Sequence, residues 1–313
     1  MRYLVRRLLT LVLTLLLVSL LTFGAFNVIP GDPVSLILGT EARADRVAVL
    51  RSHLGLDMRP GQRYLSWLSG FARGDFGTSI KYSTPVRGLI AARLPVTLFL
   101  ALLSLVLTAA VSIPLGVYCA RKHGSIQDRA IGATMMAVLS MPNFFLGVVF
   151  VWLFGLVLKL FTPGGYVDYQ ADFPRFIGYI LFPALAIALP NSAVVVKFLR
   201  GSAIGELRSD YVRTARAKGA SEDRVLYGHV LKNAIIPVIA LFGMIVAEIF
   251  SGSIIIEQVF SIPGVGRLLI SSITSRDFPL VETLVMYIAL IVVLANLAVD
   301  IAIQFIDPRI KVR

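Results

Sequence analysis

The chain has 313 residues, of which 57% are hydrophobic and only 15% are charged. A soluble globular protein usually carries about 25% charged residues, so the composition argues against a soluble protein. The formal net charge of +12 does not indicate nucleic acid, because lysines and arginines gather at the ends of apolar runs, where they set topology and contact anionic lipid head groups. The single cysteine, Cys119, excludes an intrachain disulfide and a thiolate cluster.

Apolar residues occur in runs long enough to cross a bilayer. No ionisable side chain occurs in the 24 residues between Arg7 and Asp32, and three later runs are similar or longer. The hydrocarbon core of a bilayer is about 30 Å thick and requires about 20 apolar residues of helix. We therefore predict an all-α integral membrane protein with six transmembrane helices, near residues 8–29, 95–119, 131–159, 177–197, 234–256 and 283–305.

The first span has the basic flank of a signal peptide, but its apolar run is longer than a typical signal core and no clear Ala-x-Ala site follows. We expect an uncleaved anchor. Lysine and arginine are enriched in short cytoplasmic segments, which sets the orientation. With the N-terminus inside, the inner segments hold 17 of these residues and the two short outer segments hold four. Both termini are therefore predicted to face the cytoplasm.

Residues 30–94, between the first two spans, are predicted to lie on the outer side. Glycines punctuate this segment, and Tyr64, Trp67, Leu68 and Phe71 form one apolar stripe at helical spacing. We expect a small folded cap whose apolar stripe packs against the membrane domain.

A charged segment lies between the fourth and fifth spans. Residues 210–224 read DYVRTARAKGASEDR, and seven of these fifteen residues are charged. Ser209 or Asp210 can cap a first helix, and Gly219 can take the left-handed conformation that ends it. Ser221 can cap a second helix. The segment is thus predicted to form a helix, a glycine elbow and a second helix on the cytoplasmic side.

The charges of this hairpin match the helix dipoles. Arg216 and Lys218 fall in the last turn of the first helix, and Glu222 and Asp223 fall in the first turn of the second. Each cap or dipole contact contributes about 0.5–1 kcal/mol, so several independent contacts favour the same hairpin structure. A rigid, basic projection of this kind is suited to contact a cytoplasmic protein. A helical extension lying on the inner leaflet is the alternative on these grounds alone.

The hairpin sequence, followed by HVLKNAIIPV, resembles the coupling motif of type I ABC-importer permeases, specifically the first-permease group of the dipeptide, oligopeptide and nickel systems. Arg213 stands where the generic motif has glutamate, as in the peptide-importer form Asp-Tyr-x-Arg-Thr-Ala-Arg-Ala-Lys-Gly. Further matches cover nearly the whole chain: IPGDP (29–33), LGLD (54–57), GDFGTS (74–79), RLPVTL (93–98), SMPNF (140–144), IIIEQVFSIPGVGRLL (254–269), SRDFPLV (275–281), NLAVDI (296–301) and DPRI (307–310).

The resemblance implies the MetI-like type I permease fold with an extra N-terminal span and outer segment. Residues 1–92 would form that span and segment, 93–306 the permease domain with its coupling hairpin at 209–233, and 307–313 a cytoplasmic tail. The protein would lie in the bacterial cytoplasmic (inner) membrane, surrounded by lipid. Its partners would be a homologous second permease, two cytoplasmic ATPase subunits and an extracytoplasmic substrate-binding protein.

ATP and magnesium would bind the ATPase subunits, because this chain has no G-x-x-x-x-G-K-[ST] loop. We expect no cofactor, catalytic residue or metal site in the chain itself. By the resemblance, the elbow would insert into a groove on one ATPase subunit. The residues expected at that interface are Arg213, Ala215, Ala217, Lys218, Gly219, Ala220, Ser221, Glu222 and Arg224.

Glu248, near the middle of the fifth span, is the first candidate for lining a translocation pathway. An ionisable residue inside a bilayer normally faces a cavity or a partner, and a structural ion pair is the alternative here. Ser140, Asn143 and Phe144, around Pro142, are further pathway candidates.

The expected function is ATP-driven import of di- or oligopeptides by alternating access. None of the three histidines lies mid-span, which disfavours a bare metal ion, and a nickel or metal-chelate importer is the alternative. A carrier that works alone needs intramembrane acid–base pairs and often an internal repeat, whereas the sequence shows one central carboxylate and no repeat. An enzyme is disfavoured because the spans contain no Ser/His/Asp or His-Glu-x-x-His arrangement.

Overall fold

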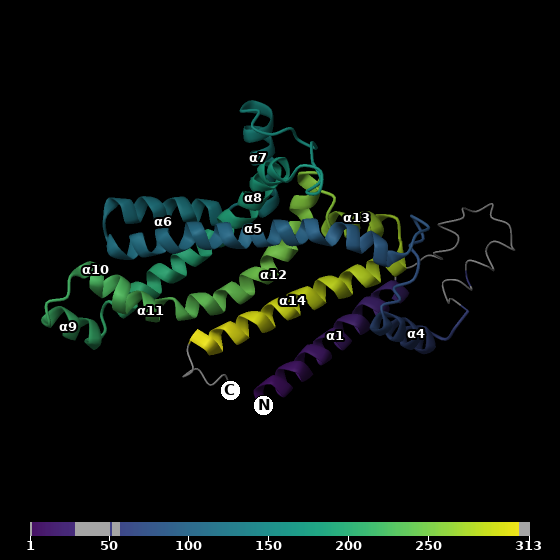
Figure 1. Ribbon diagram of the computed structural model, residues 1–313, viewed down its shortest axis with the longest axis horizontal. Helices are drawn as coiled ribbons and strands as arrows, with labels where there is room; N and C mark the ends of the chain where they lie inside the picture. Colours follow the sequence, from purple (N-terminus) through teal and green to yellow (C-terminus); the bar gives the residue numbers. More distant parts are fainter. Residues whose placement is uncertain (1, 29–50, 52–56, 307–313) are drawn as a thin grey trace. The chain divides into compact units, whose positions relative to one another are not determined.

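The computed structural model describes residues 2–28, 51 and 57–306 (Figure 1). Within these residues the structure is helical, apart from turns and an isolated β-bridge between Thr78 and Pro85. The elements are α1 (Arg2–Val28), α4 (Pro60–Arg73), α5 (Val86–Arg121), α6 (Ile126–Leu139), α7 (Asn143–Phe150), η1 (Val151–Val157), α8 (Phe173–Glu206), α9 (Asp210–Ala217), α10 (Glu222–Val225), η2 (Leu226–Val230), α11 (Leu231–Ala234), α12 (Ile236–Val259), α13 (Val265–Thr274) and α14 (Phe278–Ile306).

Within the described residues, five helices are long and apolar enough to cross a membrane: α1, α5, α8, α12 and α14. The pair formed by α6 and the α7–η1 segment meets the same criteria but is bent by 100°, and it makes a sixth span if it is counted as one. The prediction of an all-α protein with six apolar spans is therefore confirmed.

The predicted boundaries of three spans were wrong. The third span was expected as one helix over 131–159, but it breaks at Pro142, which has no N–H group and disfavours the helical conformation of the residue before it. The helices α5 and α8 have 36 and 34 residues, far more than a bilayer core requires. As a result Lys197, expected at the end of a span, lies well inside α8.

Two compact units are distinguished within the chain: residues 1–94 with 268–293, and residues 95–267 with 294–313. In the first unit the apolar stripe of α4 packs on α1, with the ring of Phe23 5.3 Å from Tyr64 and 6.3 Å from Trp67. The hydroxyl groups of Ser19 and Tyr64 are 2.8 Å apart. This packing confirms the predicted use of the stripe. The cap residues 29–50 and 52–56 and the predicted tail 307–313 lie outside the described residues.

A buried carboxylate anchors the segment between α4 and α5 in the same unit. Asp277, in the turn between α13 and α14, accepts hydrogen bonds from the Ser79 hydroxyl and from the backbone N–H groups of Ile80 (3.1 Å) and Lys81 (3.2 Å). The Lys81 ammonium also donates to the Ser271 hydroxyl at 2.7 Å. The segment before α5 is therefore held by polar contacts as well as by aromatic packing.

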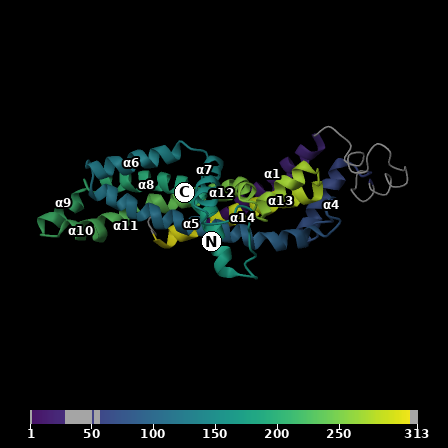
Figure 2. The ribbon, with the colours of Figure 1, turned by 90° about the horizontal axis from the view of Figure 1, so that it is seen from above.

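The second unit is built around α8, which packs against α6, α7, α11 and α12. The helix α6 runs beside α8 in both views (Figures 1 and 2). Small residues allow close approach: a Cβ at Gly116 would lie 3.0 Å from Leu199 of α8. Because α9 follows α8 after a short turn, this core sets the position of the charged hairpin.

Candidate functional site

The elbow of the charged hairpin has the predicted backbone. After α9, Gly219 adopts a φ of 82°, and no atom would lie within 4 Å of an added Cβ. The N–H of Ala220 donates to the Ala215 carbonyl at 3.1 Å, and the N–H of Gly219 donates to the Arg216 carbonyl at 2.9 Å. These two bonds form a Schellman motif, in which the left-handed glycine satisfies the last carbonyls of the helix. The predicted glycine elbow is confirmed.

The second helix begins as predicted. Ser221 is the N-cap of α10, and its hydroxyl accepts a hydrogen bond from the Arg224 N–H at 3.4 Å. The helix continues through the π-helical turn η2 and α11 toward α12. The hairpin is anchored on its inner face, where Val212, Val225 and Val230 are fully buried. The hairpin is thus fixed in position by its buried apolar face, while its charged face stays exposed.

Ion pairs brace the elbow. The Arg216 guanidinium donates two hydrogen bonds to the Glu222 carboxylate, at 2.8 and 2.9 Å, and so bridges α9 and α10. These bonds lower the pKa of the Glu222 carboxyl and raise the pKa of Arg216. Arg121, at the end of α5, pairs with Asp223 at 2.9 Å. The two α10 carboxylates therefore fix the hairpin internally and tie it to α5.

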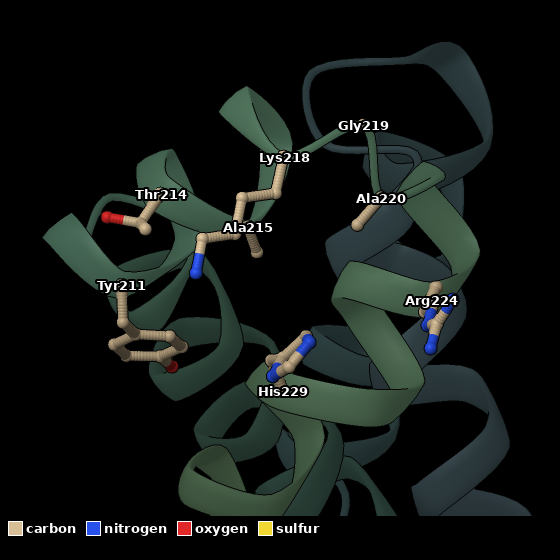
Figure 3. Close-up of a pocket in the computed structure, with 8 residues that line it drawn as sticks. All are labelled: Tyr211, Thr214, Ala215, Lys218, Gly219, Ala220, Arg224 and His229. Carbon is tan, nitrogen blue, oxygen red and sulfur yellow. The ribbon is translucent and has the colours of Figure 1, made fainter.

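The nine residues predicted for a partner interface lie together on this hairpin. Seven of them are exposed, and Ala215 and Ala220 are half-buried. Between the two helices lies a hollow of about 550 Å³ (Figure 3). Its lining includes five of the predicted residues and three that were missed: Tyr211, Thr214, Ala215, Lys218, Gly219, Ala220, Arg224 and His229.

The sequence contained a signal for two of the missed residues. Tyr211, Thr214, Ala215 and Lys218 are spaced i, i+3, i+4 and i+7, so they share one face of α9. Tyr211 is also held at the base of the hairpin, because its hydroxyl donates to the Glu206 carboxylate at 2.5 Å. Burial and this hydrogen bond raise the pKa of Tyr211.

Glu257 is a buried acidic residue that was not singled out from the sequence. The segment 257–279 was expected to lie outside the spans, but Glu257 lies inside α12 and is fully buried. Its carboxylate accepts from the Thr97 hydroxyl at 2.6 Å and from the Arg267 N–H at 3.0 Å. A side chain on Gly264 would overlap this carboxyl group. The glycines of the IPGVG motif therefore make room for Glu257, which fixes the start of α13.

The candidate pathway residues lie around the bend at Pro142. Ser140 and Phe144 are exposed there, while the Asn143 amide lies against Gly252 of α12, 3.1 Å from the position of an added Cβ. Glu248 is exposed and lies one helical turn before Gly252, on the same side of α12. The structure thus places Asn143 and Glu248 toward one face of that helix.

Comparison with known families identifies the chain. Residues 112–312 match the model of the family described as "Binding-protein-dependent transport system inner membrane component", and residues 1–101 match its N-terminal companion. The chain belongs to this family. It is a membrane-spanning permease subunit of an ABC transporter, not its catalytic subunit, and it works with ATPase and substrate-binding protein partners. Family membership removes the alternative of a carrier that works alone.

Relatives are similar from end to end. The permease is 38% identical to the oligopeptide transport system permease protein AppB of Bacillus subtilis and 35% identical to the glutathione transport system permease protein GsiC of Escherichia coli K12. It is 33% identical to the probable peptide ABC transporter permease protein y4tP of Sinorhizobium fredii. Each comparison covers 99% of both chains.

Proposed function

We propose that this permease carries di- or oligopeptides into the cell across the bacterial cytoplasmic membrane by alternating access. The observation that carries this proposal is the end-to-end similarity to permeases named for oligopeptides, peptides and glutathione. Nickel is the less favoured substrate, because these relatives are named for peptides or a tripeptide thiol rather than for metals. Among the described residues, no three His, Cys, Asp or Glu side chains form a metal-binding group either.

The charged hairpin is the element through which the ATPase drives this movement. In the proposed assembly, this chain pairs with a second permease, two ATPase subunits bind below, and a binding protein delivers substrate from outside. Shifting a two-state transporter from about 1:99 to 99:1 requires roughly 5.5 kcal/mol of differential binding energy. A flexible hairpin would deform instead of moving the spans. The Schellman elbow and the Arg216–Glu222 pair support a rigid hairpin.

The assignment of parts follows the same proposal. Residues 1–92 form the additional span and the outer segment, and 93–306 form the permease domain, with the coupling hairpin at 209–233 and a tail at 307–313. The N- and C-termini face the cytoplasm, as does the hairpin. Its nine interface residues, from Arg213 to Arg224, contact one ATPase subunit.

The pathway is formed in part by Glu248, Ser140, Asn143 and Phe144. A peptide is a zwitterion with many backbone donors and acceptors, so its pathway needs polar groups at membrane depth. An exposed carboxylate half-way along α12 is suited to face such a cavity. The amide of Asn143 adds a group that can both donate and accept hydrogen bonds.

Uptake measurements test the substrate. Cells lacking this chain would be given labelled dipeptides, longer peptides and Ni²⁺, with the intact chain restored from a plasmid. We expect loss of peptide uptake, recovered on complementation but not when the ATPase subunits are inactivated by mutation. Loss of Ni²⁺ uptake with normal peptide uptake would contradict the peptide assignment.

A charge-neutral substitution tests the pathway. Glu248→Gln keeps the size of the side chain and removes its charge, so we expect lower peptide uptake with unchanged amounts of assembled transporter. Asp168→Asn is the matched control, because Asp168 is exposed in the loop between η1 and α8, and the amide oxygen of Asn can still accept the hydrogen bond from the Gln170 N–H. Uptake kinetics of the Glu248→Gln transporter equal to those of the parent would reject the role of Glu248.

A further inference from the structure

The hollow in the hairpin is lined by positive charge without a negative partner. Lys218, at the end of α9, and Arg224, on α10, line the hollow from its two sides, and His229 lies at the base (Figure 3). Among the described residues, neither Lys218 nor Arg224 forms an ion pair, and no acidic side chain lines the hollow. We propose that this hollow receives an acidic side chain of the ATPase subunit, an inference that rests on the proposed coupling function.

The acidic residues of the hairpin are all engaged elsewhere. Three have a basic partner outside the lining: Asp210 with Arg213 at 3.5 Å, Glu222 with Arg216, and Asp223 with Arg121. Glu206 accepts a hydrogen bond from the hydroxyl of the lining residue Tyr211. None of these acids is paired with Lys218 or Arg224, so the two cations that line the hollow remain without a counter-charge. Charged patches of one sign at an interface are normally matched by the opposite sign on the partner. The excess of cations at the hollow therefore points to an anionic group.

The shape of the hollow fits a side chain. Ala215, Gly219 and Ala220 are small residues, and no atom lies within 4 Å of a Cβ placed on Gly219. The wall is thus open near the elbow, where a protruding Asp or Glu can enter. The ammonium of Lys218 or the guanidinium of Arg224 can then donate charge-assisted hydrogen bonds to its carboxylate. The contact would thus have two parts: the elbow enters a groove on the ATPase subunit, and one acidic side chain of the ATPase subunit enters the hollow of the hairpin.

A lipid phosphate is the competing anion, but the position of the hollow disfavours it. The elbow lies between the end of α8 at Glu206 and the start of α12 at Ile236, well removed along the chain from both spans. A head group is tethered to the bilayer and approaches from the spans. The walls nearest the elbow instead face the place where a cytoplasmic subunit binds in the proposed assembly.

Charge reversal tests the inference. The permease pair would be placed in nanodiscs of phosphatidylcholine, with or without phosphatidylglycerol, and binding of the ATPase subunits would be measured by fluorescence. We expect Lys218→Glu and Arg224→Glu each to weaken binding at least about tenfold in either lipid, because like charges would then face each other. Lys232→Glu makes the same charge change on α11, outside the hollow lining, and should have little effect.

Rescue identifies the partner residue. Exposed Asp and Glu residues of the ATPase subunit would be changed to Lys one at a time, and one of them should restore binding of the Lys218→Glu permease. The inference is overturned if Lys218→Glu and Arg224→Glu bind as Lys232→Glu does, or if they lose binding only with phosphatidylglycerol present. Those outcomes leave coupling through the hairpin intact. Failure of the unmodified permease pair to bind any ATPase subunit would instead refute the proposed function itself.

Discussion

Replacement of Asp128 by Asn should be among the most damaging single changes of charge in the second unit. Asp128 is only 3% exposed and lies in the first turn of α6. Its carboxylate accepts two hydrogen bonds from the Arg200 guanidinium of α8, at 2.6 and 2.7 Å, and one from the Gly124 N–H at 2.9 Å. The pair therefore joins the α5–α6 turn to the central helix of the unit.

The magnitude follows from burial. Removing one partner of a buried ion pair typically costs about 3–5 kcal/mol, because the remaining charge is left without compensation. The Arg200 side chain is 34% exposed, so water can compensate for part of the loss. We expect Asp128→Asn to lower the free energy of unfolding by about 3 kcal/mol, the lower end of that range.

Asp223→Asn is the matched comparison, because it makes the same chemical change in an exposed ion pair. The side chains of Arg121 and Asp223 are 49% and 58% exposed, and such pairs contribute about 0–1 kcal/mol. Unfolding of the two purified variants would be followed in mixed micelles by titration with denaturing detergent. Equal losses of stability in Asp128→Asn and Asp223→Asn would refute the argument from burial.

Two further predictions concern the IPGVG motif and the elbow of the hairpin. Gly264→Ala should reduce the yield of folded protein, measured by size-exclusion chromatography, because its methyl group would overlap the Glu257 carboxyl, whereas Gly178→Ala meets no atom within 4 Å and should be tolerated. The Arg216–Glu222 pair lowers the pKa of Glu222, so its stabilisation of the elbow should be fully present above the unfolded value of about 4.3 and be lost as pH falls through the lower folded pKa. Hydrogen-exchange protection of the elbow amides should show this loss, and Glu222→Gln should not; a titration that begins above pH 5 would contradict the stated cause.

The features that could be predicted from the sequence are those set by neighbouring residues. The cap at Ser221 and the left-handed Gly219 depend on a few consecutive residues, and the structure has both. Ser209 takes the N-cap position of α9, but its side chain makes no hydrogen bond to the helix. The spans depend on long apolar runs, which a bilayer requires regardless of tertiary packing. The apolar stripe of α4 was likewise visible as a helical period.

The features that could not be predicted depend on residues far apart in the chain. Pro114, Pro183 and Pro190 remain inside continuous helices, whereas Pro142 ends one, although all four lie in similar apolar runs. Local rules state only that proline weakens a helix, and the surrounding helices decide whether it breaks. Glu257 was missed for the same reason, because its hydrogen-bond partner Thr97 lies 160 residues earlier.

In the proposed coupling mechanism, the helix α5 would carry movement of the hairpin, because it makes one contact with the hairpin and another with α12. Arg121 at one end pairs with Asp223 of the hairpin, and Thr97 in the first half of the helix donates to the buried Glu257 of α12. These two positions are 24 residues apart, which is about 36 Å along a helix and comparable to the thickness of a bilayer. The exposed ion pair can break and re-form at little cost, whereas the buried hydrogen bond cannot. When the hairpin moves, the Arg121–Asp223 ion pair can therefore break and re-form, whereas the Thr97–Glu257 hydrogen bond should stay intact and move α12 together with α5. We expect Thr97→Val to impair transport more than Arg121→Gln does in the uptake assay. The reverse order would show that α5 does not carry the movement.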